Sequence, residues 1–321
     1  MNFAKAKRIP IESIPVIDIA ALTGGRTDPA AELTVAEQMG EAANGVGFFY
    51  VRNHGVPEEL IKAAFDISGR FFASPLEAKN SVRVTEKKRG YIEPYTGIMK
   101  GNTRRDFRET FLWGREFDRP TLDELASVPL VGPNQWPEFL PDMKPVLNDY
   151  FEACVEVGRK ILRAFALAME IEPGYFSGNF DRCIARGSAL YYPPQPENLG
   201  EDQFGIGAHT DWGVLTLLCQ DEVGGLQVLS GDGEWVTAHP IPGTFVVNVG
   251  DCLQKWTNRR LLSNQHRVVN SSDRYRQSIA MFVDPDFDTP IIPVVRPGET
   301  PRDEPTTCGE QVMDSFRKAY D

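Results

Sequence analysis

The chain is poor in histidine and carries no excess of positive charge. Its 321 residues include four histidines, and 45 acidic residues outnumber 34 basic ones, for a net charge of −11. A surplus of negative charge argues against nucleic acid or an anionic membrane as the main partner. Uninterrupted apolar runs also stay short of the ~18 residues that a membrane span requires. These absences favour a soluble enzyme, and no pattern in the sequence indicates an oligomeric state.

Closely spaced cysteines are missing as well. The five cysteines are scattered, odd in number and without a C-x-x-C pair, which indicates reduced cytoplasmic thiols. The basic N-terminus is followed by residues rich in isoleucine and proline instead of the apolar core of a signal peptide. We therefore predict a cytoplasmic protein whose cysteines are mostly small core residues.

Apolar periodicity divides the chain into a mixed first half and a β-rich second half. Apolar runs at 14–19 and 46–52 predict strands, and the glycine- and charge-rich stretch 84–105 predicts a loop. Helical spacing predicts helices at 29–43, 58–72, 141–171 (one long helix or two joined ones) and 308–320. Short β-rich runs recur at 188–192, 214–219, 226–229, 234–238, 245–249 and 276–283. Such spacing predicts a sandwich or barrel of short strands.

Two of the four histidines stand in a metal-ligand pattern with an aspartate. His209-Thr210-Asp211 is followed much later by His266. Two imidazoles and one carboxylate are the ligand set of a mononuclear non-haem Fe(II) centre, which leaves coordination positions open. Residues i and i+2 of a strand share a face, so we expect His209 and Asp211 on one strand and His266 on a facing strand. The alternative is a surface strand that carries an H-x-D tripeptide by chance.

Arg276 and Ser278 repeat the same i, i+2 spacing in a predicted strand. A planar guanidinium binds a carboxylate through two hydrogen bonds, and a hydroxyl beside it can donate another. The pair therefore predicts a carboxylate anchor near the metal site, with an ordinary polar strand face as the alternative. Metal and anchor together are typical of an oxygenase.

At these residues the chain resembles the iron/ascorbate-type, 2-oxoglutarate-dependent oxygenase family, which includes isopenicillin N synthase and the plant flavonoid and hormone dioxygenases. The likeness runs from about residue 14 to the C-terminal helix. One departure is Leu190, where many plant members have asparagine, so a polar contact near the co-substrate is missing. The matching stretches are GFFYVRNHGV at 47–56, FF at 71–72 with Pro75, Glu77 and Lys79, RGY at 89–91, LYYPP at 190–194, HTD at 209–211, GGLQV at 224–228, VGD at 249–251, HRV at 266–268 and RQS at 276–278.

The resemblance implies a fold and an organisation. The expected class is α+β with a mainly β core: a double-stranded β-helix (jelly roll) flanked by helices, with an N-terminal α/β region. That region is expected at 14–120 and the jelly-roll core at 181–287. Together with the C-terminal helix 308–320 they would form one compact unit.

The resemblance also implies a chemistry. Fe(II) would be held by His209, Asp211 and His266, and the distal carboxylate of 2-oxoglutarate by Arg276 and Ser278. Tyr192 would donate its hydroxyl to a co-substrate carboxylate, with half-buried strand packing as the equal alternative. With O2, and with ascorbate as a candidate reductant, such an enzyme oxidises a small molecule and releases succinate and CO2. Hydroxylation is the default outcome, and desaturation or ring closure needs only another fate for the substrate radical.

Two other functions fit the same residues. An oxidase like isopenicillin N synthase needs no 2-oxoglutarate and would use Arg276 and Ser278 for the carboxylate of its own substrate. A non-catalytic barrel could use the cleft to bind a carboxylate ligand. The intact triad argues against the second, because a mere binder has no use for three converging iron ligands.

Overall fold

Two β-sheets form the centre of the molecule. The computed structural model describes residues 14–25, 28–96, 106–194, 204–270 and 272–320. The strands are β1 Val16–Asp18, β2 Phe48–Arg52, β3 Gly90–Ile92, β4 Glu109–Gly114, β5 Arg186–Tyr192, β6 Ile206–His209, β7 Leu215–Gln220, β8 Leu226–Leu229, β9 Trp235–Thr237, β10 Thr244–Val249, β11 His266–Val268, β12 Arg276–Val283, β13 Pro290–Ile291 and β14 Thr306–Thr307. The larger sheet has eight strands in the order β1-β2-β10-β7-β12-β5-β4-β3, and the smaller has four in the order β6-β11-β8-β9.

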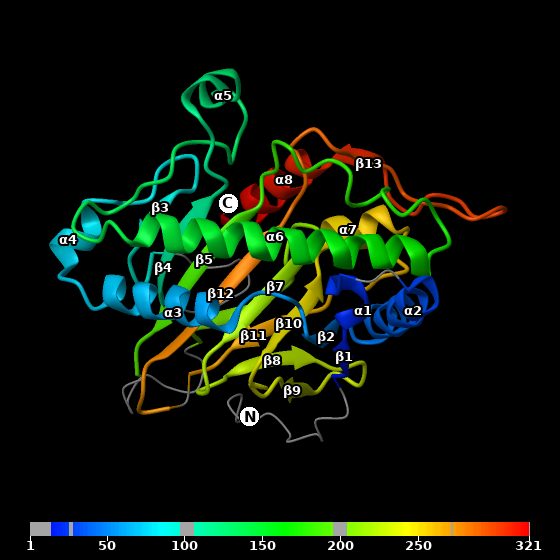
Figure 1. Cartoon of the computed structure of the whole chain (residues 1–321), viewed down its shortest axis with the longest axis horizontal. Coiled ribbons are helices and arrows are strands. Elements are labelled where there is room, and N and C mark those ends of the chain that lie inside the picture. Colours follow the sequence, from blue (N-terminus) through cyan, green and yellow to red (C-terminus); the bar gives the residue numbers. More distant parts are fainter. Residues whose placement is uncertain (1–13, 26–27, 97–105, 195–203, 271, 321) are drawn as a thin grey trace.

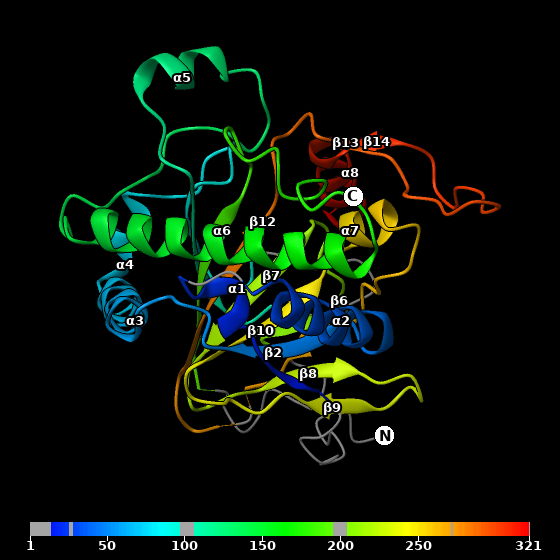
Figure 2. The ribbon, with the colours of Figure 1, turned by 45° about the vertical axis from the view of Figure 1, so that its right-hand side comes forward.

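Helices cover the outer face of the larger sheet. The helices of the described chain are α1 Ala20–Thr23, α2 Pro29–Gly45, α3 Glu58–Phe72, α4 Leu76–Asn80, α5 Arg119–Glu124, α6 Met143–Ala168, α7 Asp251–Trp256 and α8 Cys308–Tyr320. α6 packs on β7 and β12, α3 on β5 and β12, and α2 on β1 and β2. Figure 1 shows α6 and α3 crossing in front of these strands, and Figure 2 shows β8 and β9 on the side away from α6. This is the predicted α+β fold with a jelly-roll core.

The residues of strand β12 alternate between the core under the helices and the interior of the barrel. Ile279, Met281 and Val283 belong to the large core between sheet and helices, whereas Ala280 belongs to a smaller cluster inside the barrel. Arg276, Ser278, Ala280 and Phe282 line the internal cavity. Alternate residues of a strand point to opposite faces, so one strand supplies apolar packing outward and site residues inward.

The first part of the chain closes both edges of the larger sheet. β1 lies parallel to β2, with α2 in the connection between them, and β2 pairs with β10 of the core. At the other edge β3 pairs with β4, and β4 pairs with β5. Both edges of the core's large sheet are therefore made from the N-terminal region.

Most predicted elements match the structure, and one needs correction. α2 begins as the sequence indicated: Pro29 follows Asp28, whose side chain accepts hydrogen bonds from the N–H groups of Ala30 and Ala31. The 141–171 stretch forms one helix, α6. The predicted loop 84–105 instead contains β3, because its residues pair with β4; residues 97–105 lie outside the described part.

The burial of the cysteines also follows the sequence analysis. All five cysteines are free and buried. Within the described residues, no helix has the length and apolar character of a membrane-crossing segment.

A close approach between Gly187 and Trp113 makes a stability prediction possible. The two residues face each other across β5 and β4, and a Cβ on Gly187 would overlap the indole ring. Trp113 is fully buried and donates its indole N–H to the carbonyl of Leu147 at 3.2 Å, so it cannot move away freely. We expect Gly187→Ala to lower the free energy of unfolding by about 1–3 kcal/mol through overpacking, measured as a lower Tm. Gly231→Ala is the control, because nothing lies within 4 Å of that position; equal Tm values for the two variants would contradict the prediction.

Candidate active site

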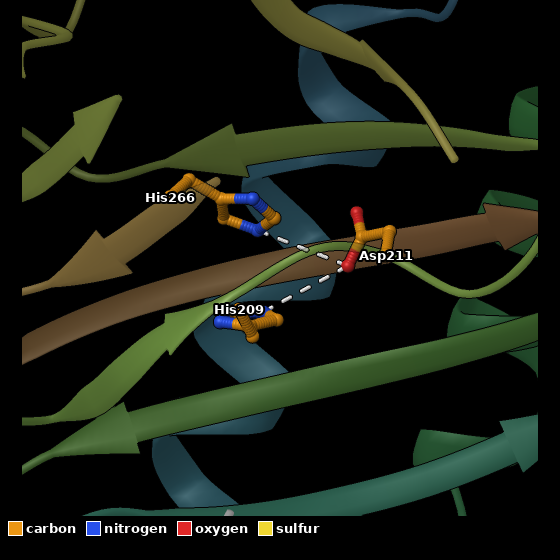
Figure 3. A group of neighbouring side chains, drawn as sticks. All are labelled: His209, Asp211 and His266. Atoms are coloured by element: carbon orange, nitrogen blue, oxygen red, sulfur yellow. Dashed lines mark ion pairs between the residues drawn. The ribbon is translucent and has the colours of Figure 1, made fainter. Parts of the chain in front are cut away.

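His209, Asp211 and His266 meet inside the barrel. His209 is the last residue of β6 and His266 is the first of β11, and the two are register partners. Their ring centroids are 4.2 Å apart, and each Nε2 atom lies 3.8 Å from Oδ1 of Asp211. Figure 3 shows both imidazoles facing the same carboxylate oxygen. The candidate ligand atoms of all three residues lie within 4.8 Å of one another, a spacing and donor set that fit a divalent metal such as Fe(II).

Asp211 reaches this position in a different way from the one predicted. β6 ends at His209, so Asp211 lies in the loop after the strand and not on its face. The first residues of α7 hold that loop: the N–H of Asp251 donates to the carbonyl of Asp211 at 2.8 Å, and the N–H of Cys252 donates to that of Gly213 at 3.0 Å. Free N–H groups at a helix N-terminus, rather than strand pleating, therefore place the carboxylate.

The Asp211 carboxylate uses its two oxygens differently. Oδ2 accepts hydrogen bonds from the hydroxyl of Thr216 at 2.5 Å and from the amide of Asn248 at 2.7 Å. Oδ1 is the oxygen that faces both imidazoles. Burial raises the pKa of Asp211, but the nearby His266 and His209 and the two hydrogen bonds outweigh it and lower the pKa below its usual range. The carboxylate is thus ionised. Its Oδ2 is occupied by two hydrogen bonds, and its Oδ1 is directed at the candidate metal position.

His209 is held in the form that a metal ligand needs. Its Nδ1 lies 2.9 Å from the carbonyl oxygen of Gly207; since a carbonyl can only accept, Nδ1 carries the proton and Nε2 keeps its lone pair. Burial, followed by the neighbouring His266, lowers the pKa of His209 to about 3. The imidazole is therefore neutral at physiological pH.

Asp251, the last residue of the VGD stretch at 249–251, supports the site although its sequence context indicated only a turn. Its Oδ2 accepts from the hydroxyl of Thr210 at 3.1 Å, and its Oδ1 accepts from the hydroxyl of Ser263 at 2.6 Å. It thereby ties the loop that carries Asp211 to the segment that leads into His266. Thr216 and Asn248 were missed; a polar residue inside an otherwise apolar strand was the available signal.

Arg276 and Ser278 form the second part of the site, as their spacing predicted. Arg276 is fully buried, and its Nη1 donates to Oγ of Ser278 at 2.9 Å. It also donates to the carbonyl of Gly224 and to Oε1 of Gln220. Within the described ranges Arg276 has no carboxylate oxygen within salt-bridge distance, although its charge acts on the more distant Asp221 and lowers the pKa of that carboxyl against the larger, opposite effect of burial. A ligand carboxylate fits this place.

Tyr192 lies beside Arg276, and its position is compatible with each of the two expected roles. The two residues are register partners, and the guanidinium carbon is 4.6 Å from the centre of the phenol ring. The ring is packing, yet the hydroxyl is buried and has no hydrogen-bond partner among the residues that the structure describes. Buried hydroxyls are nearly always paired, so a ligand oxygen here would complete its hydrogen bonding.

A single cavity joins the two parts. Its empty volume, including the open mouth, is about 590 Å³. Leu190 lies in its wall, which confirms that an apolar side chain stands there. The lining residues are Phe48, Arg108, Ser188, Leu190, Tyr192, Ile206, His209, Asp211, Thr216, Leu218, Leu226, Asn248, His266, Val268, Arg276, Ser278, Ala280 and Phe282.

The other two histidines stand away from this cavity. His54 is buried against Phe245, and its Nδ1 accepts the N–H of Val56 at 3.2 Å. His239 is exposed. Neither belongs to the metal cluster found in the described residues.

A jelly roll that encloses two histidines, one aspartate and a buried arginine has the architecture of a non-haem-iron oxygenase. Two family models match the chain: "non-haem dioxygenase in morphine synthesis N-terminal" over residues 14–139 and "2OG-Fe(II) oxygenase superfamily" over residues 185–285. The homoarginine-6-hydroxylase 2-ODD-C23 of Glycine max is 38% identical over 300 residues, which cover 88% of each chain. The 2-oxoglutarate-Fe(II) type oxidoreductase hxnY of Emericella nidulans is 34% identical over 95% of this chain and 90% of its own length. The chain belongs to the 2OG-Fe(II) oxygenase superfamily.

Solved structures agree with this assignment. A full-length Neurospora crassa protein, crystallised in complex with alpha-KG and thymine, superimposes with a TM-score of 0.83 and 29% identity, over 98% of this chain and 99% of that one. A 2OG-Fe(II) oxygenase family protein from Caulobacter crescentus gives the same TM-score at 27% identity, with 98% and 99% covered. The protein is a non-haem Fe(II)- and 2-oxoglutarate-dependent oxygenase.

The hydrogen bond from Thr216 to Asp211 predicts an effect on metal affinity. Thr216→Val keeps the shape of the side chain but removes the donor to Oδ2. Loss of a hydrogen bond that orients a metal ligand typically lowers metal affinity about 10- to 100-fold, and we expect an Fe(II) dissociation constant raised by that factor in an anaerobic titration. Thr244→Val is the control, because its hydroxyl donates to the carbonyl of Ile241 far from the cavity. Unchanged Fe(II) affinity in Thr216→Val would show that Asp211 does not depend on this contact.

Proposed function

We propose that His209, Asp211 and His266 hold the Fe(II), and that Arg276, Ser278 and Tyr192 hold 2-oxoglutarate, in an enzyme that hydroxylates a small amino acid. The observation that carries the proposal is the cavity itself, which joins a three-ligand cluster to a fully buried arginine. The solved relative that contains alpha-KG supports 2-oxoglutarate over an oxidase that does without it.

With 2-oxoglutarate as the co-substrate, the atoms and electrons of the proposed hydroxylation balance. With iron bound, O2 and 2-oxoglutarate supply an oxidant for an unactivated C–H bond: one oxygen atom enters the substrate as a hydroxyl group, the other enters succinate, and CO2 leaves. The side chains bind and orient 2-oxoglutarate, and they exclude water. Arg276 and Ser278 fix the far carboxylate of 2-oxoglutarate, and the Tyr192 hydroxyl donates to an oxygen of the same molecule. Ascorbate is the proposed reductant that keeps the metal ferrous.

The metal end is arranged to keep coordination positions open. Because Thr216 and Asn248 occupy Oδ2 of Asp211, only Oδ1 faces the metal position. A carboxylate that binds through one oxygen takes up one position, which leaves more of the metal's coordination sphere for 2-oxoglutarate and O2. The apolar walls at Leu190, Leu218 and Val268 keep the reacting centre dry.

Relatives suggest the substrate class. Homoarginine-6-hydroxylases of Glycine max, Oryza sativa and Arabidopsis thaliana are 38%, 35% and 37% identical to the chain. On that basis we propose L-homoarginine as the first substrate to test, with Fe(II), 2-oxoglutarate and ascorbate present. The product expected by mass spectrometry is the amino acid with one added oxygen atom, formed in step with succinate.

The metal assignment leads to a prediction on three variants. His209→Ala, Asp211→Ala and His266→Ala should each abolish succinate formation and lower Fe(II) binding below detection, because two remaining ligands do not hold the ion against water. Circular dichroism and Tm serve as controls that the barrel is folded. Wild-type oxygen consumption in all three variants would refute the metal assignment.

The anchor assignment leads to a prediction on 2-oxoglutarate. Arg276→Gln removes a charged hydrogen bond worth about 1.5–3 kcal/mol, so the KM for 2-oxoglutarate should rise roughly 10- to 150-fold. Ser278→Ala should have a smaller effect, because a neutral hydroxyl makes a weaker bond. Fe(II) affinity is the internal control, since neither residue is a proposed ligand. An unchanged KM in Arg276→Gln would place the co-substrate carboxylate elsewhere.

A further inference from the structure

A second arginine, Arg108, lines the cavity at a different place from Arg276. It directly precedes β4, whose first pair is Glu109 with Tyr191. The N–H of Phe107 donates to the carbonyl of Phe204 at 3.2 Å, and the N–H of Gly207 donates to Oδ1 of Asp106 at 3.3 Å. These contacts lay the segment 106–108 alongside the start of β6, the strand that ends at His209. Arg108 therefore stands at the gap between β4 and β6.

Arg276 begins β12, which lies two strands from β4 in the larger sheet. Its guanidinium bonds to the carbonyl of Gly224 and to Gln220, which lie at the β7–β8 connection. Strand β5, with Tyr192, separates β12 from β4 in the large sheet. Neighbouring strands are ~4.8 Å apart, so the backbones of the two arginines are separated by two strand spacings. One small dicarboxylate anchored at Arg276 leaves the region of Arg108 to another ligand.

The surroundings of Arg108 orient its guanidinium. Nη2 forms an ion pair with Oδ2 of Asp106 at 3.3 Å, and Nη1 donates to Oγ1 of Thr110 at 3.3 Å. Both contacts come from residues two positions away along the chain, and both are at the long end for hydrogen bonds. The side chain is 22% exposed, so it is largely withdrawn from water yet reachable from the cavity. Charged hydrogen bonds gain strength in such partly desolvated places.

We propose that Arg108 binds the carboxylate of the organic substrate and so makes the enzyme selective for small carboxylic acids, amino acids included. This inference rests on the proposed function, in which Arg276 is already assigned to 2-oxoglutarate. A flat guanidinium fork matches a carboxylate better than it matches a neutral polar group. Among the described residues that line the cavity, Arg108 is the one cation apart from Arg276, which suits a single negative charge better than a phosphate dianion.

The test uses binding as its readout, with matched pairs of ligands. The full-length enzyme, loaded anaerobically with Fe(II) and 2-oxoglutarate, is titrated by calorimetry with L-homoarginine and L-homoargininamide. A panel of other amino acids and their primary amides follows. We expect the wild type to bind at least one acid roughly 10- to 150-fold more tightly than its amide, the range for one charged hydrogen bond. In Arg108→Gln that preference should disappear, and Arg108→Lys should restore part of it.

Two comparisons separate this inference from the proposed function. Arg108→Gln should bind 2-oxoglutarate with a dissociation constant within about twofold of wild type, whereas Arg276→Gln should not. Loss of 2-oxoglutarate binding in Arg108→Gln would assign Arg108 to the co-substrate and overturn the inference alone. A wild-type enzyme that prefers no acid of the panel over its amide, or a preference that survives in Arg108→Gln, would overturn it as well. Failure of the wild type to bind 2-oxoglutarate at all would instead contradict the proposed function.

Discussion

The site depends on one constraint: the two carboxylate oxygens of Asp211 have different partners. A buried carboxylate is costly unless it is paired and hydrogen-bonded, and here Thr216 and Asn248 satisfy one oxygen while two imidazoles face the other. Those four partners come from β7, β10, β6 and β11, which belong to both sheets. The arrangement therefore exists only when the two sheets are closed on each other, so folding and assembly of the proposed metal site are one event.

Closing the barrel in turn requires the parts of the chain outside it. The larger sheet is buried on both faces, because α2, α3 and α6 cover the outside and the cavity lies inside. Its edges would be open without β1–β2 and β3–β4, and open edges invite pairing with other chains. The N-terminal region also carries Arg108 and the segment that runs beside β6. The same residues thus protect the sheet and complete the wall of the cavity.

Residue spacing in the sequence predicted the parts of the site that rest on strand alternation. Arg276 and Ser278 lie on one face of β12 because the pleat repeats every two residues. The same rule failed for Asp211, because β6 ends at His209. Hydrogen bonds from the start of α7 fix the position of Asp211 instead. Short strands such as β3 and β6 carry too few residues for a periodic signal, and contacts such as Asp251 with Ser263 depend on tertiary packing that no local pattern encodes. The domain limits 14–120 and 181–287 stay predictions.

Charge placement explains why the cavity can hold a reactive metal and still choose its ligands. The chain is strongly acidic, yet the cavity wall carries two arginines and, among the described lining residues, the single carboxylate of Asp211. The two arginines attract an anionic ligand within the cavity, where low polarity strengthens each ion pair, although the net charge of the chain is negative. Arg276 is fully buried and Arg108 partly so. The deeper cation suits the co-substrate, which binds in one orientation at every turnover. The shallower one, next to the strand of His209, suits the ligand whose C–H bond must be brought to the metal and whose product must leave.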